Sequence, residues 1–243
     1  MIRGIIDGFG SYFSVLSFIN KHQLYRYFLI SGIISLCLGG LIFTASYFLS
    51  DDLGAILFKL YPFEKWSEYA LKISNFIGGS MVAVLGIMLY KYLLLICVSP
   101  FMGPLSAQVE HILTGESIEA KFSIKQASYE IIRGTRIALR NVVRELGLTL
   151  LLVILSLIPI FTVFVAPLIF MVQSYYAGFG NLDYYLERRA NIKQSVLYVK
   201  KHRGLAIGNG AGFLLLLLIP VLGLFLAPVM STIAATKSAI AAR

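Results

Sequence analysis

Two long stretches of the chain carry almost no charge and indicate the first membrane spans. Residues 27–50 form an uncharged run of 24 residues, which as a helix is long enough to cross about 30 Å of hydrocarbon. A second apolar run covers residues 73–99 and is interrupted only by Lys91. Because Asp51 and Asp52 follow the first run, we expect the first helix to end there. The pattern therefore predicts two long transmembrane helices, at 27–50 and 73–99.

Two further apolar runs are longer and contain prolines. Residues 146–182 hold 37 residues without a charge, and residues 204–236 hold 33. Proline inside a helix removes a hydrogen bond and clashes with the preceding turn, so each run is predicted to form two short helices joined by a bend. The prolines assigned to these bends are Pro159, Pro167, Pro220 and Pro228. We therefore expect two helical hairpins with arms of roughly 15 to 18 residues, barely enough to cross a bilayer.

The two proline-containing runs also resemble each other. Ile158-Pro159 and Ala166-Pro167 recur as an Ile-Pro pair and an Ala-Pro pair with the same spacing, 61 positions later. Paired, proline-broken apolar segments are typical of the structural repeats of transporters. The alternative is chance similarity, because apolar segments have low sequence complexity.

The prolines also indicate an anion site within the membrane. If helices restart at Pro167 and Pro228, proline occupies a first-turn position that suits it, and the positive ends of these helices face the bend. Discontinuous helices of this kind bind anionic groups in transporters. Since Thr162 is the sole hydroxyl in these otherwise apolar bends, an apex that touches lipid is the alternative.

Residues 1–26 are predicted to form an amphipathic helix at the membrane surface. Large apolar side chains recur there at three- and four-residue steps, as in helices that lie along the lipid headgroups: Ile5, Ile6, Phe9, Tyr12, Phe13, Leu16 and Ile19. Gly4, Gly8 and Gly10 offer an alternative, in which this segment packs closely on another helix.

Composition agrees with a membrane protein and excludes several other classes. Of the 243 residues, 58% are hydrophobic and 14% are charged, whereas about a quarter are charged in a soluble domain. This composition excludes disorder, a coiled coil and an ordinary soluble globule. The net charge of +9 fits Lys and Arg anchors in cytoplasmic loops, so nucleic acid is not indicated as a partner. We predict an all-α, polytopic membrane protein with a single domain over residues 1–243.

The counts of Lys and Arg predict the orientation. Segment 51–72 holds three of them, whereas the other segments outside the predicted spans hold 17. Positive charge accumulates on the cytoplasmic side, so 51–72 is expected outside and both termini inside. The remaining connections are then a cytoplasmic helical link at 104–145 and a basic link at 183–203.

No pattern along the chain indicates a catalytic, metal or cofactor site. His22, His111 and His202 are scattered, and Cys37 and Cys97 have no metal-type spacing. We expect the two cysteines to be buried packing residues. The sequence therefore predicts no enzyme activity, no metal and no cofactor.

Glycines at every fourth position open the second hairpin. Together with Gly210, the residues Gly204, Gly208 and Gly212 match a phosphate-binding loop only superficially, because no strand precedes them. On a helix they form one small-residue face, which lets another helix approach closely. We expect them to serve helix packing.

Four arginines at helical spacing precede the third apolar run. Arg133, Arg136, Arg140 and Arg144 are separated by steps of three, four and four, so they share one helix face. One interpretation is a stripe exposed to solvent or lipid headgroups. The other is an electrostatic funnel that concentrates anions before entry.

Several short segments resemble one known family. The tripeptide Leu113-Thr114-Gly115 and the segments 98–101 (Val-Ser-Pro-Phe) and 105–110 (Leu-Ser-Ala-Gln-Val-Glu) resemble the CysZ-type sulfate permeases. The two proline hairpins and the charged link 183–203 occur in the same order in that family. The broader family includes the eukaryotic etoposide-induced membrane protein.

The resemblance implies an oligomeric protein of the bacterial inner membrane that passes sulfate or a related oxyanion inward, feeding sulfur assimilation and cysteine synthesis. In the family, a Gly-Leu-Arg stretch that opens the first span, often followed by a second Arg, is tied to sulfate. The aligned residues here are Gln23, Leu24, Tyr25 and Arg26, so only the leucine and the second arginine match. Arg26 is therefore the expected anion ligand.

These departures leave alternatives open for the substrate. Losing a glycine amide and one arginine removes charge-assisted donors from a site for a dianion. In the segment that corresponds to residues 105–110, relatives tend to carry an acidic residue before a Gln or Lys. This chain has Ala107 before Gln108, so that acid is missing, whereas Glu110 is kept. The alternatives are a monovalent anion, or a membrane scaffold of the same fold that transports nothing.

Overall fold

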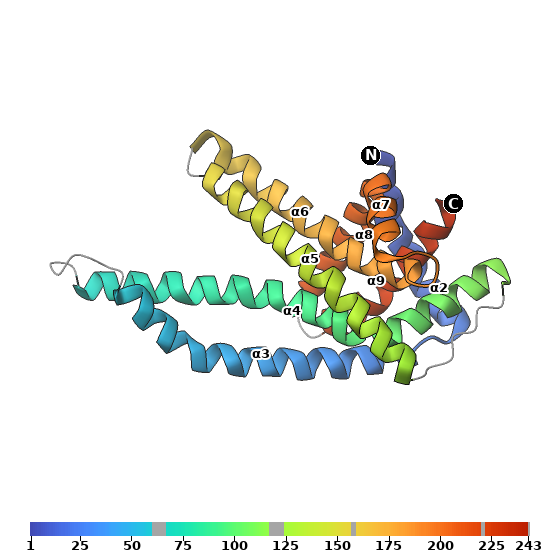
Figure 1. Cartoon of the computed structure of the whole chain (residues 1–243), viewed down its shortest axis with the longest axis horizontal. Helices are drawn as coiled ribbons and strands as arrows, with labels where there is room; N and C mark the ends of the chain where they lie inside the picture. The colour runs from blue at the N-terminus through green and yellow to red at the C-terminus, as the bar shows by residue number, and fades with distance from the viewer. Residues whose placement is uncertain (60–66, 117–123, 157–158, 220–221, 243) are drawn as a thin grey trace. The chain divides into compact units, whose positions relative to one another are not determined.

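The computed structural model describes residues 1–59, 67–116, 124–156, 159–219 and 222–242, and their side chains except at 45–59, 67–89, 124, 125, 127, 159, 160 and 162. Every regular element within these ranges is a helix (Figure 1). In chain order they are α1 (Ile2–Gly10), η1 (Ser11–Ser14), α2 (Val15–His22), α3 (Arg26–Lys59), α4 (Ser67–Thr114), α5 (Ile124–Ser156), α6 (Pro159–Leu186), α7 (Ile192–Lys201), α8 (Arg203–Leu217) and α9 (Leu222–Ala241). The predicted all-α class is confirmed.

Four stretches of the described chain are long and apolar enough to cross a membrane. They lie in α3, α4, α6 and α9, at Arg26–Thr44, Tyr90–Thr114, Val163–Leu186 and Leu222–Ala241. The apolar helix α8, with 15 residues, is shorter than these. The prediction of a polytopic membrane protein is therefore confirmed.

The two long helices extend beyond their predicted ends. α3 continues through Asp51 and Asp52, because charge ends an apolar run but only proline or glycine strongly disfavours the helix itself. α4 likewise continues past Pro100. Proline cannot donate to the carbonyl four residues earlier, and the Ser99 hydroxyl instead donates to that carbonyl, of Ile96, at 2.8 Å. The predicted link at 104–145 is consequently divided between the end of α4 and the first part of α5.

Two of the four prolines assigned to the hairpin bends do not lie at a bend. α6 begins at Pro159, where the missing N–H costs nothing because a first-turn amide has no partner within the helix. Pro167 and Pro228, in contrast, lie inside α6 and α9, so the prediction that helices restart there is wrong. Neighbouring helices make interior prolines tolerable in apolar helices. Pro220 lies outside the described residues.

The chain divides into two compact units, of which Met1–Ile34 with Leu95–Arg243 is the larger and Ser35–Leu94 the smaller. In the larger unit α8 packs against α1, α6 and α9, and α5 packs along α6 (Figure 1). The smaller unit comprises the later part of α3 and the earlier part of α4.

Glycines allow α8 to pack closely on α1. A Cβ added to Gly8 would lie 2.6 Å from the Leu205 carbonyl oxygen, and one added to Gly208 would lie 2.8 Å from the Phe9 nitrogen. Gly204 faces Gly4 at the same contact. The packing role predicted for the glycines is therefore confirmed. The N-terminal segment packs on another helix through Gly4 and Gly8, although Gly10 takes no part because nothing lies within 4 Å of it. Its place at the membrane surface stays a prediction.

A short chain of buried polar groups joins α6, α8 and α9. The Asn181 amide donates to the Asn209 side-chain oxygen at 2.9 Å, and the Asn209 amide donates to the Ser231 carbonyl at 3.0 Å. The Tyr12 hydroxyl donates to the Asn209 carbonyl at 2.7 Å. These bonds give the apolar core one specific register, since a buried polar group without a partner is costly.

The two cysteines are not buried. Cys37 and Cys97 are both exposed, so the prediction that they are buried packing residues is wrong. Both lie on apolar helices, where exposed apolar side chains face lipid rather than water, and a cysteine behaves there as a small apolar residue.

Candidate functional site

The turn between α2 and α3 holds the four residues of the predicted anion site. Gln23 has a φ of 53°, a left-handed conformation that ends α2 and turns the chain. Leu24 is 1% exposed and anchors this turn in the core. The Tyr25 hydroxyl donates to the Asn20 side-chain oxygen at 2.9 Å. Arg26 then begins α3.

Arg26 is the residue of this turn that is suited to bind an anion. Its Nη2 donates to the Gln108 oxygen at 3.1 Å and to the Tyr27 hydroxyl at 3.3 Å, and its guanidinium lies 5.0 Å from the centre of the Tyr27 ring. These partners are neutral, so they position the guanidinium without cancelling its charge. A guanidinium has five N–H donors, which leaves several for a ligand. Because the first turn of α3 contains no acidic residue, the positive end of the helix adds to the attraction.

The predicted arginine stripe on α5 is divided by its surroundings. Arg133 is 3% exposed and binds Asp183 through two hydrogen bonds, Nη2 to Oδ1 at 2.8 Å and Nε to Oδ2 at 3.0 Å. It also donates to the Ala190 carbonyl and the Ser195 hydroxyl. Burial alone lowers the pKa of Arg133, but the bonds and charge of Asp183 outweigh it and keep the pKa raised. Arg133 therefore ties α5 to the end of α6 and to α7, and the funnel role predicted for it is wrong.

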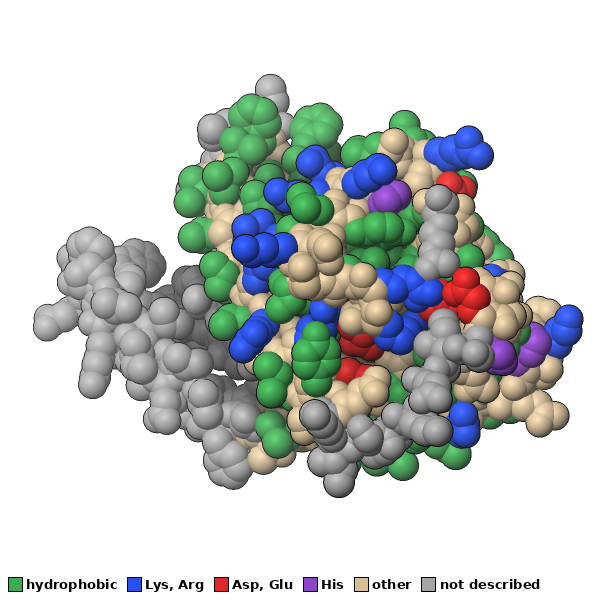
Figure 2. All heavy atoms as spheres, turned by 45° about the vertical axis from the view of Figure 1, so that its right-hand side comes forward, with side chains coloured by type: hydrophobic (Ala, Val, Ile, Leu, Met, Phe, Trp, Pro, Cys, Tyr) green, Lys and Arg blue, Asp and Glu red, His purple; other side chains and the backbone are tan. Residues whose placement is uncertain are grey.

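Arg136 and Arg144, in contrast, are exposed, and Arg140 is half-buried. Arg140 and Arg144 line a pocket of about 360 Å³ together with Lys200 of α7 and Arg203 of α8. Figure 2 shows Lys and Arg side chains gathered on one face, next to hydrophobic side chains. Arg136 does not line this pocket.

The four cations of this pocket lack acidic partners. Within the part of the chain that the structure describes, no ion pair joins Arg140, Arg144, Lys200 or Arg203 to a carboxylate. Burial and the neighbouring charge of Arg144 lower the pKa of Arg140. Arg140 is held by neutral groups, the Asn141 side-chain oxygen at 2.8 Å and the Phe179 ring at 5.4 Å. We refer to this site as the α5–α8 cationic pocket.

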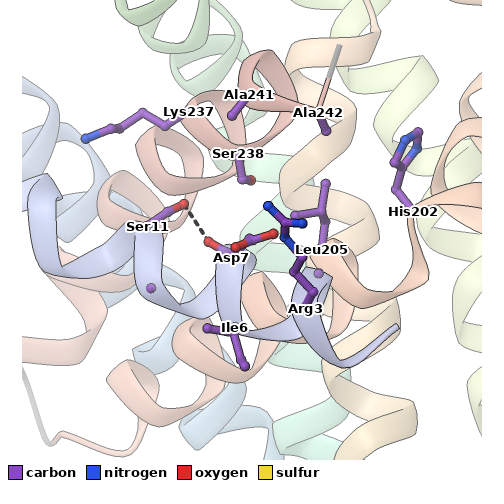
Figure 3. Close-up of a pocket in the computed structure, with 12 residues that line it drawn as sticks. Arg3, Ile6, Asp7, Ser11, His202, Leu205, Lys237, Ser238, Ala241 and Ala242 are labelled. Carbon is purple, nitrogen blue, oxygen red and sulfur yellow. Dashed lines mark hydrogen bonds between the residues drawn. The ribbon is translucent and has the colours of Figure 1, made fainter.

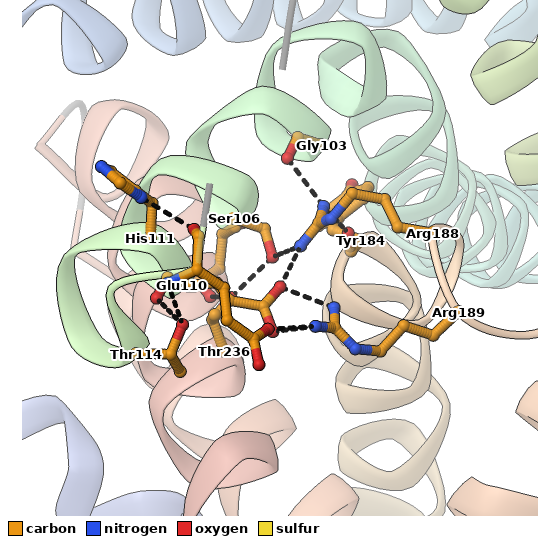
Figure 4. A network of polar contacts seen from close by, with 11 residues as sticks. Gly103, Ser106, Glu110, His111, Thr114, Tyr184, Arg188, Arg189 and Thr236 are labelled. Atoms are coloured by element: carbon orange, nitrogen blue, oxygen red, sulfur yellow. Dashed lines mark hydrogen bonds and ion pairs between the residues drawn. The ribbon is translucent and has the colours of Figure 1, made fainter. Parts of the chain in front are cut away.

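A second group of basic residues serves structure. Glu110 on α4 is fully buried and forms ion pairs with Arg188 and Arg189, which follow α6 (Figure 4). Arg188 also donates to the Gly103 carbonyl at 3.0 Å and to the Ser106 hydroxyl at 3.0 Å. This network joins the end of α4 to the end of α6. The charge of Glu110 is used in these ion pairs.

Two carboxylates approach each other beside this network. Glu130 of α5 and Glu187, just after α6, both face Gly103: a Cβ added there would lie 3.2 Å from the Glu130 carboxyl carbon and closer still to the Glu187 Oε1. Burial raises the pKa of Glu187 well above its ordinary value, and the charges of Glu130 and Asp183 raise it further. Burial also raises the pKa of Glu130. Both carboxyl groups therefore keep a proton to a higher pH than a free glutamic acid does.

A larger cavity of about 670 Å³ lies between α1, the start of α8 and the end of α9 (Figure 3). Its polar lining combines both signs of charge, with Arg3 and Lys237 against Asp7. The Ser11 hydroxyl donates to the Asp7 carbonyl at 2.7 Å, and the Lys237 ammonium reaches the Ser14 hydroxyl. Because the charges of its lining are mixed, this cavity selects an anion less well than the α5–α8 cationic pocket.

The apolar helices and the cationic groups exposed between them define a polytopic helical membrane protein. The chain matches the family model described as "Sulfate transporter CysZ/Etoposide-induced protein 2.4" over residues 11–228. It therefore belongs to this family of sulfate-transporter-like membrane proteins. No curated protein matches it.

Several residues of these sites were not predicted from the sequence. Asp183, Arg188 and Arg189 were assigned only to a basic link, and Lys200 and Arg203 were not connected with the arginine stripe. Asp183, Lys200 and Arg203 meet the stripe only through the packing of α6, α7 and α8, and Arg188 and Arg189 meet Glu110 of α4. No local spacing indicates that contact.

Proposed function

We propose that this protein is a permease or channel that passes sulfate or a related oxyanion into the cell. We place it in the bacterial inner membrane, as a homo-oligomer with both termini in the cytoplasm, where it would feed sulfur assimilation and cysteine synthesis. Passage is passive or linked to a gradient, because no nucleotide-binding motif is recognisable in the sequence. Membership of the sulfate transporter family supports the substrate class.

The observation that carries this proposal is the charge of Arg26. Its partners Gln108 and Tyr27 are neutral, so an anion can bind without displacing a carboxylate. A tetrahedral oxyanion accepts hydrogen bonds from the remaining N–H groups of the guanidinium, in the planar geometry that arginine offers to such groups. Gln23, Leu24 and Tyr25 form the turn that positions Arg26.

The electrostatic funnel is proposed only for the exposed arginines of the stripe. Arg136 and Arg144 on α5 contribute a positive field that raises the local concentration of anions. Arg133 contributes little to this field because Asp183 neutralises it.

The test is uptake of radiolabelled sulfate by liposomes that contain the purified protein, with empty liposomes as background. Arg26→Ala should lower uptake about tenfold or more, because a charge-assisted hydrogen bond contributes about 1.5–3 kcal/mol. Lys193→Ala, which removes an exposed cation of α7 far along the chain, is the matched control and should leave uptake unchanged. Chloride, phosphate and sulfite as competitors identify the preferred anion.

Each outcome separates the site from the function. Uptake that does not depend on Arg26 would retain the transport function and disprove the site. A correctly assembled protein that carries no anion at all would favour the alternative, a membrane scaffold of the same fold. Size-exclusion chromatography of each variant shows whether assembly is intact.

A further inference from the structure

We propose that the α5–α8 cationic pocket binds the phosphate headgroup of an anionic phospholipid. This proposal does not depend on anion transport. Its basis is that four cations and an apolar wall meet in one pocket of about 360 Å³.

The polar side of the pocket fits a phosphate group. Arg140 and Arg144 approach it from α5, while Lys200 and Arg203 approach it from α7 and α8. Among the described residues none of these four is paired with a carboxylate, so a bound anion relieves their mutual repulsion.

Neutral contacts set the positions of two of the cations. The Phe179 ring and the Asn141 side chain hold Arg140, and Arg203 donates to the Lys200 carbonyl at 3.1 Å. These two guanidiniums are therefore held in place before a ligand arrives, which reduces the entropy lost on binding.

The remaining wall of the pocket is apolar and fits acyl chains. It is formed by side chains of α5, α6 and α8, namely Leu148, Leu168, Met171, Val172 and Ile207, together with Tyr175 and Tyr176 of α6. Leu148 and Leu168 are also exposed, and the apolar surface continues from them along α5 and α6 through Leu151 and Val163. Cations beside a lipid-facing apolar surface are the arrangement that binds phospholipid headgroups between transmembrane helices.

This apolar wall favours a lipid over a free oxyanion. A small, strongly hydrated anion such as sulfate gains nothing from contact with leucine and methionine side chains, whereas a phospholipid buries its glycerol and acyl groups there. A bound lipid would neutralise Arg140 and Arg144. Arg136, which does not line the pocket, would then be the main member of the stripe that attracts free anions.

The experiment is a native mass spectrometry titration of the purified full chain. The probes are dioctanoyl phosphatidylglycerol, dioctanoyl phosphatidylcholine with the same chains and no net charge, and sodium sulfate at matched ionic strength. The test variant is Arg144→Gln with Arg203→Gln. The matched control, Arg136→Gln with Lys201→Gln, removes the same charge from neighbouring exposed positions that do not line the pocket.

We expect the wild type to bind one phosphatidylglycerol, and the test variant to bind it about 30-fold more weakly, since each basic residue contributes about a fivefold factor at a membrane surface. The control pair should change this affinity less than about threefold, because salt screens the effect of charges that do not contact the lipid. Equal losses in the two pairs would overturn the proposal. Displacement of phosphatidylglycerol by an equal concentration of sulfate would also overturn it, because the pocket would then be a site for free oxyanions. If the double variant does not fold, Arg144→Gln against Arg136→Gln gives the same comparison.

Discussion

The contact between α6 and α8 gives a sharp prediction, because two glycines face the opposite backbone there. A Cβ added to Gly210 would lie 2.6 Å from the Ser174 carbonyl carbon, 2.7 Å from the Gly178 nitrogen and closer still to the Ser174 oxygen. These neighbours are backbone atoms of α6, so no side-chain rotation relieves the clash. Gly210→Ala is therefore expected to force the two helices apart.

The size of the effect follows from this geometry. Carbon atoms in contact are about 3.5–4.0 Å apart, so the helices must separate by about 1 Å. Overpacking of this kind costs up to about 3 kcal/mol. Separation also stretches the bond between Asn181 and Asn209, and a hydrogen bond between membrane helices contributes about 0.6 kcal/mol. Since alanine favours a helix over glycine by about 1 kcal/mol, we expect a net destabilisation of about 2.5 kcal/mol.

The assay is unfolding in mixed micelles with increasing sodium dodecyl sulfate, followed by circular dichroism. Gly147→Ala is the matched control, because it lies inside α5 and nothing surrounds its added Cβ within 4 Å. This variant should be more stable than the wild type by up to about 1 kcal/mol. Gly210→Ala with wild-type or greater stability would refute the packing argument, since it would mean that α6 and α8 do not approach as described.

Two further predictions concern buried charges. Arg133→Met should cost about 3–5 kcal/mol in the same unfolding assay, because it leaves the Asp183 carboxylate buried without a partner, and Asp183→Asn added to it should recover part of that loss. Glu187→Gln should change how stability depends on pH. Because folding raises the pKa of Glu187, the contribution of this group to stability is fully present below the unfolded pKa of about 4.3 and is lost as pH rises through the folded value. The variant should match the wild type near pH 4 and have the higher melting temperature at pH 8; equal melting temperatures at pH 8 would contradict the raised pKa.

Features that depend on local sequence were predictable. The apolar runs predicted the membrane class, and glycines at every fourth position predicted a close helix contact at Gly204 and Gly208. Both signals arise within one helix, from composition and from the 3.6-residue period. The helix ends were less predictable. Hydropathy indicates where the apolar run ends, whereas α3 continues as a helix through Asp51.

The roles of the arginines were not predictable from their spacing. Arg133 and Arg140 share one face of α5, yet Arg133 is buried against Asp183, 50 positions away, whereas Arg140 lines a pocket with residues of α7 and α8. The difference comes from which carboxylate the packing of α6 brings near each position. The sequence indicates a stripe of charge, and only the tertiary contacts decide which members stay available to a ligand.

The pairing of carboxylates explains why two separate cationic sites can exist in one small protein. Asp183 pairs with Arg133, and Glu110 pairs with both Arg188 and Arg189, so each of these three arginines has a carboxylate partner. The cations at Arg26 and in the α5–α8 cationic pocket instead have neutral partners among the described residues. Both sites therefore attract anions, but only the pocket adds an apolar wall. The two proposals consequently predict opposite patterns, since Arg26→Ala should reduce sulfate uptake without affecting phosphatidylglycerol binding, and Arg144→Gln with Arg203→Gln should weaken lipid binding more than uptake.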